Sequence, residues 1–121
     1  MTDLLTFADY QQFILNTGFY PGRREIGEKP NMEGLTYCAL GIAGEAGEVA
    51  DKIKKLLRDH GGQLTPELKD GLIKEVGDVL WYLTAMANEL DIRIDLVAQT
   101  NIDKINSRTA RGTRQGSGDD R

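Results

Sequence analysis

The chain has 121 residues, which is enough for one compact domain and too few for two. Its formal net charge of −4 lacks the excess of basic residues by which proteins hold nucleic-acid polymers or acidic membranes. A single cysteine excludes an internal disulfide, and no apolar run is long enough to cross a bilayer. We therefore expect a cytoplasmic protein that binds neither a membrane nor a nucleic-acid polymer.

End signals predict the first two helices. Thr6 and Asp9 resemble a capping box and indicate a short helix that ends ahead of a loop rich in Pro and Gly. Asn31 is a candidate N-cap for a long second helix that runs to a Gly-Gly pair. Gly41 and Gly44 interrupt the helical pattern in its first half, so a break or kink is an open alternative there.

The third and fourth helices follow without a strand pattern between them. Thr65 offers a hydroxyl cap and Pro66 favours the first helical position, which predicts a helix that continues to about Leu90. A last helix is expected from about Asp95 to about Arg108.

Apolar residues at helical spacing predict the fold class. They form three stripes: Val49, Ile53, Leu56 and Leu57; Val76, Val79, Leu80, Leu83, Ala87 and Leu90; and Leu96, Val97, Ile102 and Ile105. Long helices joined by short turns pack antiparallel, so we expect an all-α, antiparallel bundle of about four to five helices, with the last stripe as a third wall. Because the chain is short and these faces are broad, oligomerisation is expected to complete the bundle.

The domain is expected to span residues 1–108, followed by a polar tail over 109–121. From residue 107 onward the chain carries four Arg and two Asp. This basic segment is either a disordered terminus or a lid that folds over a bound anion.

Polar side chains share the helical spacing of the apolar stripes. They are Glu45, Glu48, Lys52 and Lys55 on the second helix; Glu75, Asp78 and Tyr82 on the third; and Asn101, Lys104 and Arg108 on the last. Antiparallel packing can bring the two acid pairs to the same level, where either some of the carboxylates are protonated or a cation offsets their repulsion. Oxygen ligands without His or Cys suit Mg²⁺ or Mn²⁺, and the basic stripes suit a polyphosphate.

Two other interpretations apply to the same residues. A Glu-x-x-Glu pair or an Asn/Lys/Arg stripe taken alone is usually solvated surface, so the residues by themselves leave the metal site and an ordinary surface both open. A di-iron carboxylate bundle is excluded, because it needs Glu-x-x-His pairs and the only histidine, His60, has Leu57 three residues before it.

The segments "GEAGEVAD", "KEVGDVLWYL" and "NIDKINSR" together resemble the MazG-like, all-α nucleoside triphosphate pyrophosphohydrolases, over roughly Leu35 to Arg108. The resemblance implies dimers or dimers of dimers with sites at subunit boundaries, and Gly44 stands where relatives carry a further acid. It implies a role for each polar stripe residue: Glu45, Glu48, Glu75 and Asp78 as metal ligands, Lys52 or Lys55 with Asn101, Lys104 and Arg108 as phosphate and sugar contacts, and Tyr82 beside the nucleotide.

The implied reaction converts a nucleoside triphosphate and water to the monophosphate and pyrophosphate, with Mg²⁺ as cofactor and Mn²⁺ as a substitute. Glu48 is the candidate for positioning the attacking water, and Glu45 is the alternative. Two other functions stay open at this point. One is a house-cleaning or phage-type enzyme for a single nucleotide such as dUTP, dCTP or dGTP, and the other is a non-catalytic, nucleotide-binding helical oligomer.

Overall fold

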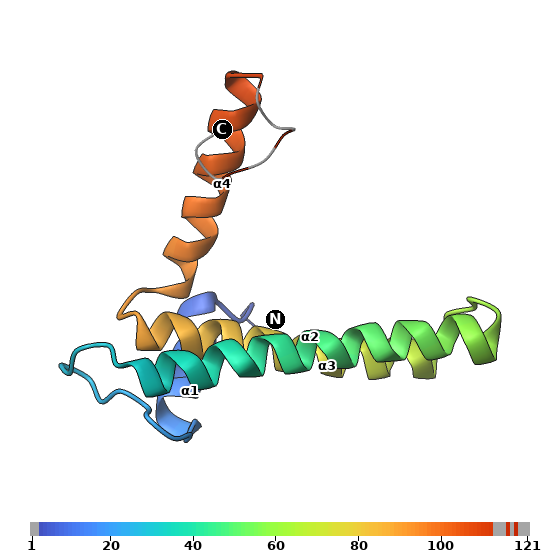
Figure 1. Cartoon of the computed structure of the whole chain (residues 1–121), viewed down its shortest axis with the longest axis horizontal. Coiled ribbons are helices and arrows are strands. Elements are labelled where there is room, and N and C mark those ends of the chain that lie inside the picture. Colours follow the sequence, from blue (N-terminus) through green and yellow to red (C-terminus); the bar gives the residue numbers. More distant parts are fainter. Residues whose placement is uncertain (1–2, 113–115, 117, 119–121) are drawn as a thin grey trace.

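A computed structural model describes residues 3–112, 116 and 118, and this part of the chain is entirely helical without strands. The helices are α1 (Phe7–Thr17), α2 (Met32–His60), α3 (Pro66–Glu89) and α4 (Ile94–Ala110) (Figure 1). The predicted all-α class is confirmed. Most of the tail predicted over 109–121, including the candidate lid, lies outside the described residues.

The helix ends agree with the predicted signals. The Thr6 hydroxyl accepts from the backbone N–H of Asp9, whose carboxylate accepts from the N–H of Thr6 in return. The side-chain oxygen of Asn31 accepts from the N–H of Gly34 and caps α2, and that of Thr65 accepts from the N–H of Leu68 and caps α3. The C-cap residue that follows α2 is Gly61, whose φ of 59° is the left-handed conformation that glycine adopts without strain.

α2 continues through both of its suspect glycines, so the helix does not break there. It lies antiparallel along α3, and the two form a long hairpin (Figure 1). α1 packs against the α3 side at one end of this hairpin, where Ile14, Cys38 and Ala85 form a small buried core. The thiol of Cys38 is fully shielded from solvent in this core.

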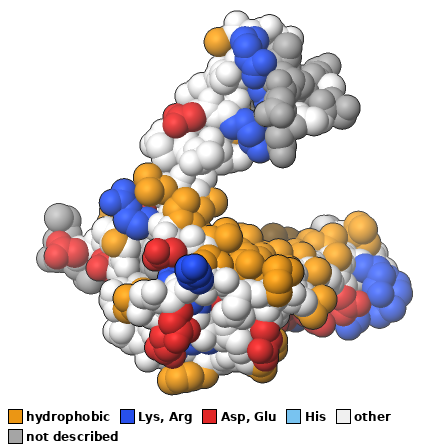
Figure 2. Space-filling model, turned by 60° about the vertical axis from the view of Figure 1, so that its left-hand side comes forward, with side chains coloured by type: hydrophobic (Ala, Val, Ile, Leu, Met, Phe, Trp, Pro, Cys, Tyr) orange, Lys and Arg blue, Asp and Glu red, His pale blue; other side chains and the backbone are white. Residues whose placement is uncertain are grey.

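Much of the apolar surface lies outside this core. Hydrophobic side chains gather in a band along the hairpin (Figure 2). Large residues of the predicted stripes are at least one-third exposed: Ile53, Leu57, Val76, Leu80, Leu83 and Leu90. A single copy of the chain therefore leaves uncovered the faces that the sequence pattern assigned to a core.

α4 stands away from the hairpin instead of forming its third wall (Figure 1). Among the described helices, it contacts α1 and α3 but not α2. Its apolar residues are accordingly exposed: Leu96, Val97, Ile102 and Ile105. None of the helices in the described part of the chain is both long and apolar enough to cross a membrane.

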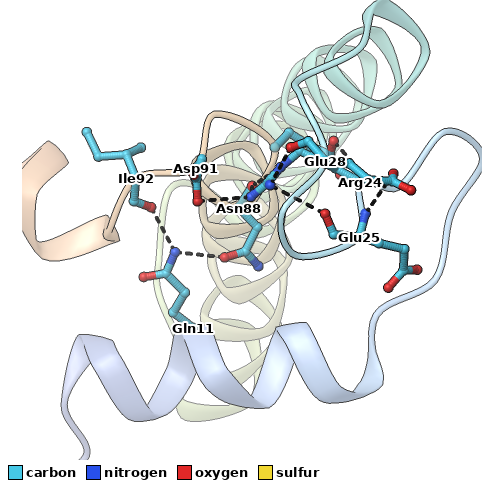
Figure 3. Close-up of polar contacts among 8 residues, drawn as sticks. Gln11, Arg24, Glu25, Glu28, Asn88, Asp91 and Ile92 are labelled. Carbon is cyan, nitrogen blue, oxygen red and sulfur yellow. Dashed lines mark hydrogen bonds and ion pairs between the residues drawn. The ribbon is translucent and has the colours of Figure 1, made fainter.

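A side chain of α1 fixes the turn from which α4 departs (Figure 3). Gln11 donates to Asn88 Oδ1 at 2.7 Å and to the carbonyl of Ile92 at 3.0 Å, and its own carbonyl oxygen accepts from the N–H of Ile94 at 2.9 Å. Arg93, the N-cap residue of α4, makes no capping hydrogen bond of its own. Gln11 therefore caps α4 from a distant part of the sequence.

We expect Gln11→Ala to lower the free energy of unfolding by about 1–2 kcal/mol, because it removes a helix cap and two partly buried hydrogen bonds. The measurement is urea unfolding at a fixed chain concentration. Gln12→Ala is the matched control, since the side chain of Gln12 bonds Asn16 of its own helix on the exposed surface of α1. Equal effects of the two substitutions would contradict the capping role.

Candidate functional site

Three carboxylates from α2 and α3 converge at the middle of the hairpin. Carboxylate oxygens of Glu45, Glu75 and Asp78 lie within 4.8 Å of one another. Residues three or four apart share one helical face, and the antiparallel packing brings the face of α2 that carries Glu45 against the face of α3 that carries the other two acids. The structure thus brings together three of the four acids that the sequence singled out.

Glu48 is the acid outside this group. Its side chain is exposed, and no oxygen of it belongs to the three-carboxylate cluster. It is still near enough to act on Glu45 electrostatically. Among the described residues, Glu48 is therefore an acid beside the cluster and not a member of it.

The cluster is electrostatically unfavourable without a cation. Partial burial raises the pKa of Glu45 above its usual value, and the negative charges of Asp78, Glu75 and Glu48 raise it further. The Nζ of Lys52 lies 3.7 Å from Oε1 of Glu75 and offsets part of this charge. Lys55 instead pairs with Asp51 of its own helix at 2.7 Å.

An aromatic cleft opens beside the carboxylates. It has a volume of about 290 Å³ and is lined by Glu45, Asp78, Trp81 and Tyr82. The rings of Trp81 and Tyr82 meet edge to face, with centroids 5.0 Å apart. Burial raises the pKa of the Tyr82 phenol, so the ring presents a neutral hydroxyl at neutral pH.

Two further tyrosines extend this aromatic group. Tyr37 lies 6.3 Å from Tyr82, and Tyr20 stacks on Tyr37 with ring centroids 5.5 Å apart. Tyr37 was not among the residues predicted from the sequence. Its position eight residues before Glu45 is the signal that could have found it, because two helical turns return to the same face of α2.

A larger cavity, of about 360 Å³, lies at the junction of α1 with the α3–α4 turn. Its polar groups bond one another (Figure 3): the guanidinium of Arg24 donates to the carbonyl of Asn88 at 2.8 Å and pairs with Asp91 at 3.2 Å. Two of the three clustered acids, Glu45 and Asp78, line the smaller cleft beside Trp81 and Tyr82. That cleft is therefore the better candidate for chemistry.

The basic stripe of α4 does not reach the carboxylates of the same chain. Asn101, Lys104 and Arg108 lie on the helix that has no contact with α2. Arg108 is largely buried and donates to the carbonyl of Gly118 at 3.1 Å.

The sequence profile of the MazG nucleotide pyrophosphohydrolase domain matches residues 34–112, which include the carboxylate cluster, the aromatic pair and α4. The chain belongs to this family. A relative named Gene 37 protein, from Mycobacterium phage L5, is 47% identical to this chain over 112 residues. The match covers 93% of this chain and 96% of the relative, whose name states no activity. No solved structure shows a significant match.

The donor set fits a hard divalent cation. Three carboxylates offer oxygen ligands, and neither His nor Cys belongs to the group, which suits Mg²⁺ or Mn²⁺ and not a softer metal. At Gly44, where the resemblance leads one to expect a further acid, an added Cβ would meet open space in the described structure.

We expect Mg²⁺ to stabilise the protein by about 1.4 kcal/mol at a concentration ten times its dissociation constant, through binding to the folded state. Asp78→Asn should abolish most of this gain, because it removes one of the three clustered carboxylates. The measurement is thermal unfolding with and without Mg²⁺. Asp70→Asn, an exposed change on the same helix, is the control and should keep the full response.

Proposed function

We propose that the chain is a metal-dependent nucleotide pyrophosphohydrolase that converts a (deoxy)nucleoside triphosphate to the monophosphate and pyrophosphate. The observation that carries the proposal is the convergence of Glu45, Glu75 and Asp78 beside an aromatic cleft, in a chain of the MazG nucleotide pyrophosphohydrolase family. A purely structural protein would gain nothing from three mutually repelling carboxylates at this place.

Glu45, Glu75 and Asp78 would hold Mg²⁺, with Mn²⁺ as a substitute. When bound, the metal would offset charge on the phosphate oxygens and on the pyrophosphate leaving group. Lys52 is placed to move between Glu75, its partner at 3.7 Å, and a phosphate oxygen of the substrate. Lys55 is the second candidate phosphate contact, although Asp51 holds it in the free protein.

Glu48 would position the attacking water. Its place outside the three-carboxylate group supports this role, because an acid that does not hold the metal can accept a proton from water. The water oxygen would form a bond to the α-phosphorus while the bond from that phosphorus to the bridging oxygen of pyrophosphate breaks. The proton released from water would pass to the Glu48 carboxylate. Glu45 remains the alternative for this role.

We expect the protein with Mg²⁺ to release pyrophosphate and not orthophosphate from nucleoside triphosphates. Glu48→Gln should lower kcat about 100-fold or more, the usual contribution of a general base, without loss of helical circular dichroism. Glu33→Gln, exposed in the first turn of the same helix, is the control. A panel that includes dUTP, dCTP and dGTP would identify the preferred base, and full activity of Glu48→Gln would remove the proposed role.

A second copy of the chain would complete the site. The exposed apolar faces of α4 and of the hairpin support a homo-oligomer, either a dimer or a dimer of dimers, in which these faces cover one another. α4 of one copy would then bring Asn101, Lys104 and Arg108 to the carboxylates of its partner. The departure of α4 from its own hairpin (Figure 1) supports this exchange.

Mixing two inactive variants tests this arrangement. Glu48→Gln removes the hairpin half of a site and Lys104→Ala removes the α4 half. If each site combines two copies, random mixing after co-refolding leaves about one-quarter of the sites intact, and activity should recover to about that fraction. Two copies of the same variant provide the baseline. Sites formed within one chain would give no recovery above it.

A further inference from the structure

A very close approach between α2 and α3 lies at the aromatic end of the cleft. A Cβ atom built on Gly41 of α2 would lie only 2.3 Å from Cδ1 and Cε1 of the Tyr82 ring on α3. Real Cβ atoms essentially never approach another heavy atom to less than 3.0 Å. The ring of Tyr82 therefore lies against bare backbone, and any other residue at position 41 would displace it.

We propose that Gly41 is a positioning residue that holds Tyr82 in the wall of the cleft, and that this pair limits the space for the nucleoside part of the substrate. The proposal rests on the proposed nucleotide pyrophosphohydrolase activity and adds a determinant of specificity to it. Gly41 itself contacts no reacting atom and acts through the Tyr82 ring.

The register of the two helices separates this contact from the metal ligands. Glu45 lies one helical turn after Gly41, and Asp78 lies one turn before Tyr82. The face of α2 with Gly41 and Glu45 thus lies against the face of α3 with Tyr82 and Asp78. The carboxylates meet at one helical turn of this contact, and the glycine meets the tyrosine ring at the next turn. A displaced Tyr82 ring would change the nucleoside end of the cleft and leave the carboxylates in place.

Gly41 differs in this respect from the other glycines of the same segment. Apart from the adjacent residues and the backbone of α2 itself, no heavy atom of the described structure lies within 4 Å of a Cβ built on Gly44 or Gly47. A glycine inside a helix is destabilising relative to alanine, so its presence there needs a compensating reason. At position 41 the reason is steric, because the Tyr82 ring occupies the place of a side chain.

Trp81 provides a direct measurement, because it is the single tryptophan of the chain and its ring lies 5.0 Å from that of Tyr82. Gly41→Ala should change its fluorescence in the absence of any nucleotide. Titration with a non-hydrolysable triphosphate and Mg²⁺ should show the dissociation constant raised about tenfold or more, a typical effect of one misplaced methyl group in a pocket. With substrate, KM should rise similarly while kcat stays within about threefold.

Gly47→Ala is the matched control, since it adds the same methyl group to the same helix without a neighbour. Tyr82→Ala and the double variant Gly41→Ala/Tyr82→Ala then test whether Gly41 acts through Tyr82. Once the ring is absent, alanine at position 41 should have no further effect on affinity. Additive losses of affinity, or a fall in kcat equal to the rise in KM, would overturn the proposal.

The outcomes separate this proposal from the proposed activity. If the unmodified protein neither binds the triphosphate nor releases pyrophosphate, the activity fails. If it does both and Gly41→Ala binds equally well, the activity stands and the positioning role fails. If Gly41→Ala alone does not fold, recovery of the fold in the double variant supports the contact, and an unfolded double variant overturns it.

Discussion

The antiparallel packing of α2 against α3 is the interaction on which the candidate site depends. It sets two adjacent levels across the hairpin, one with Glu45 near Asp78 and the other with Gly41 against Tyr82. A shift of one helical turn, about 5.4 Å along the axis, would separate the acids and press the tyrosine ring against a side chain. The steric fit between Gly41 and the Tyr82 ring therefore helps to hold α2 and α3 in the one register that brings the mutually repelling carboxylates together.

Local signals in the sequence were sufficient for the helix ends and for the choice of acids. The caps at Thr6, Asn31 and Thr65 act within three residues, so their effect can be read without a fold. Three of the four selected acids converge, because helical spacing and antiparallel packing leave few alternatives. Glu48 lies beside the cluster and not in it, because membership depends on side-chain geometry across the two helices, which spacing along one helix does not give.

The direction of α4 could not be predicted from the sequence. It depends on a hydrogen bond between Ile94 and Gln11, which are 83 residues apart, and α4 has no capping side chain at its own start. The apolar spacing of α4 predicted a third wall of the bundle, and this prediction is wrong for a single copy, because the residues of that face are exposed. The exposed face and the absence of contact with α2 are the observations from which the contact with another copy is proposed.

The burial of Cys38 gives the junction of three helices a chemical reporter. The thiol packs with Ile14 of α1 and Ala85 of α3, and burial raises its pKa, so little thiolate forms at neutral pH. A thiol reagent can therefore react only after these helices separate. The rate of modification measures the opening of the end of the hairpin that anchors α1, independently of events at the carboxylates or at the tryptophan.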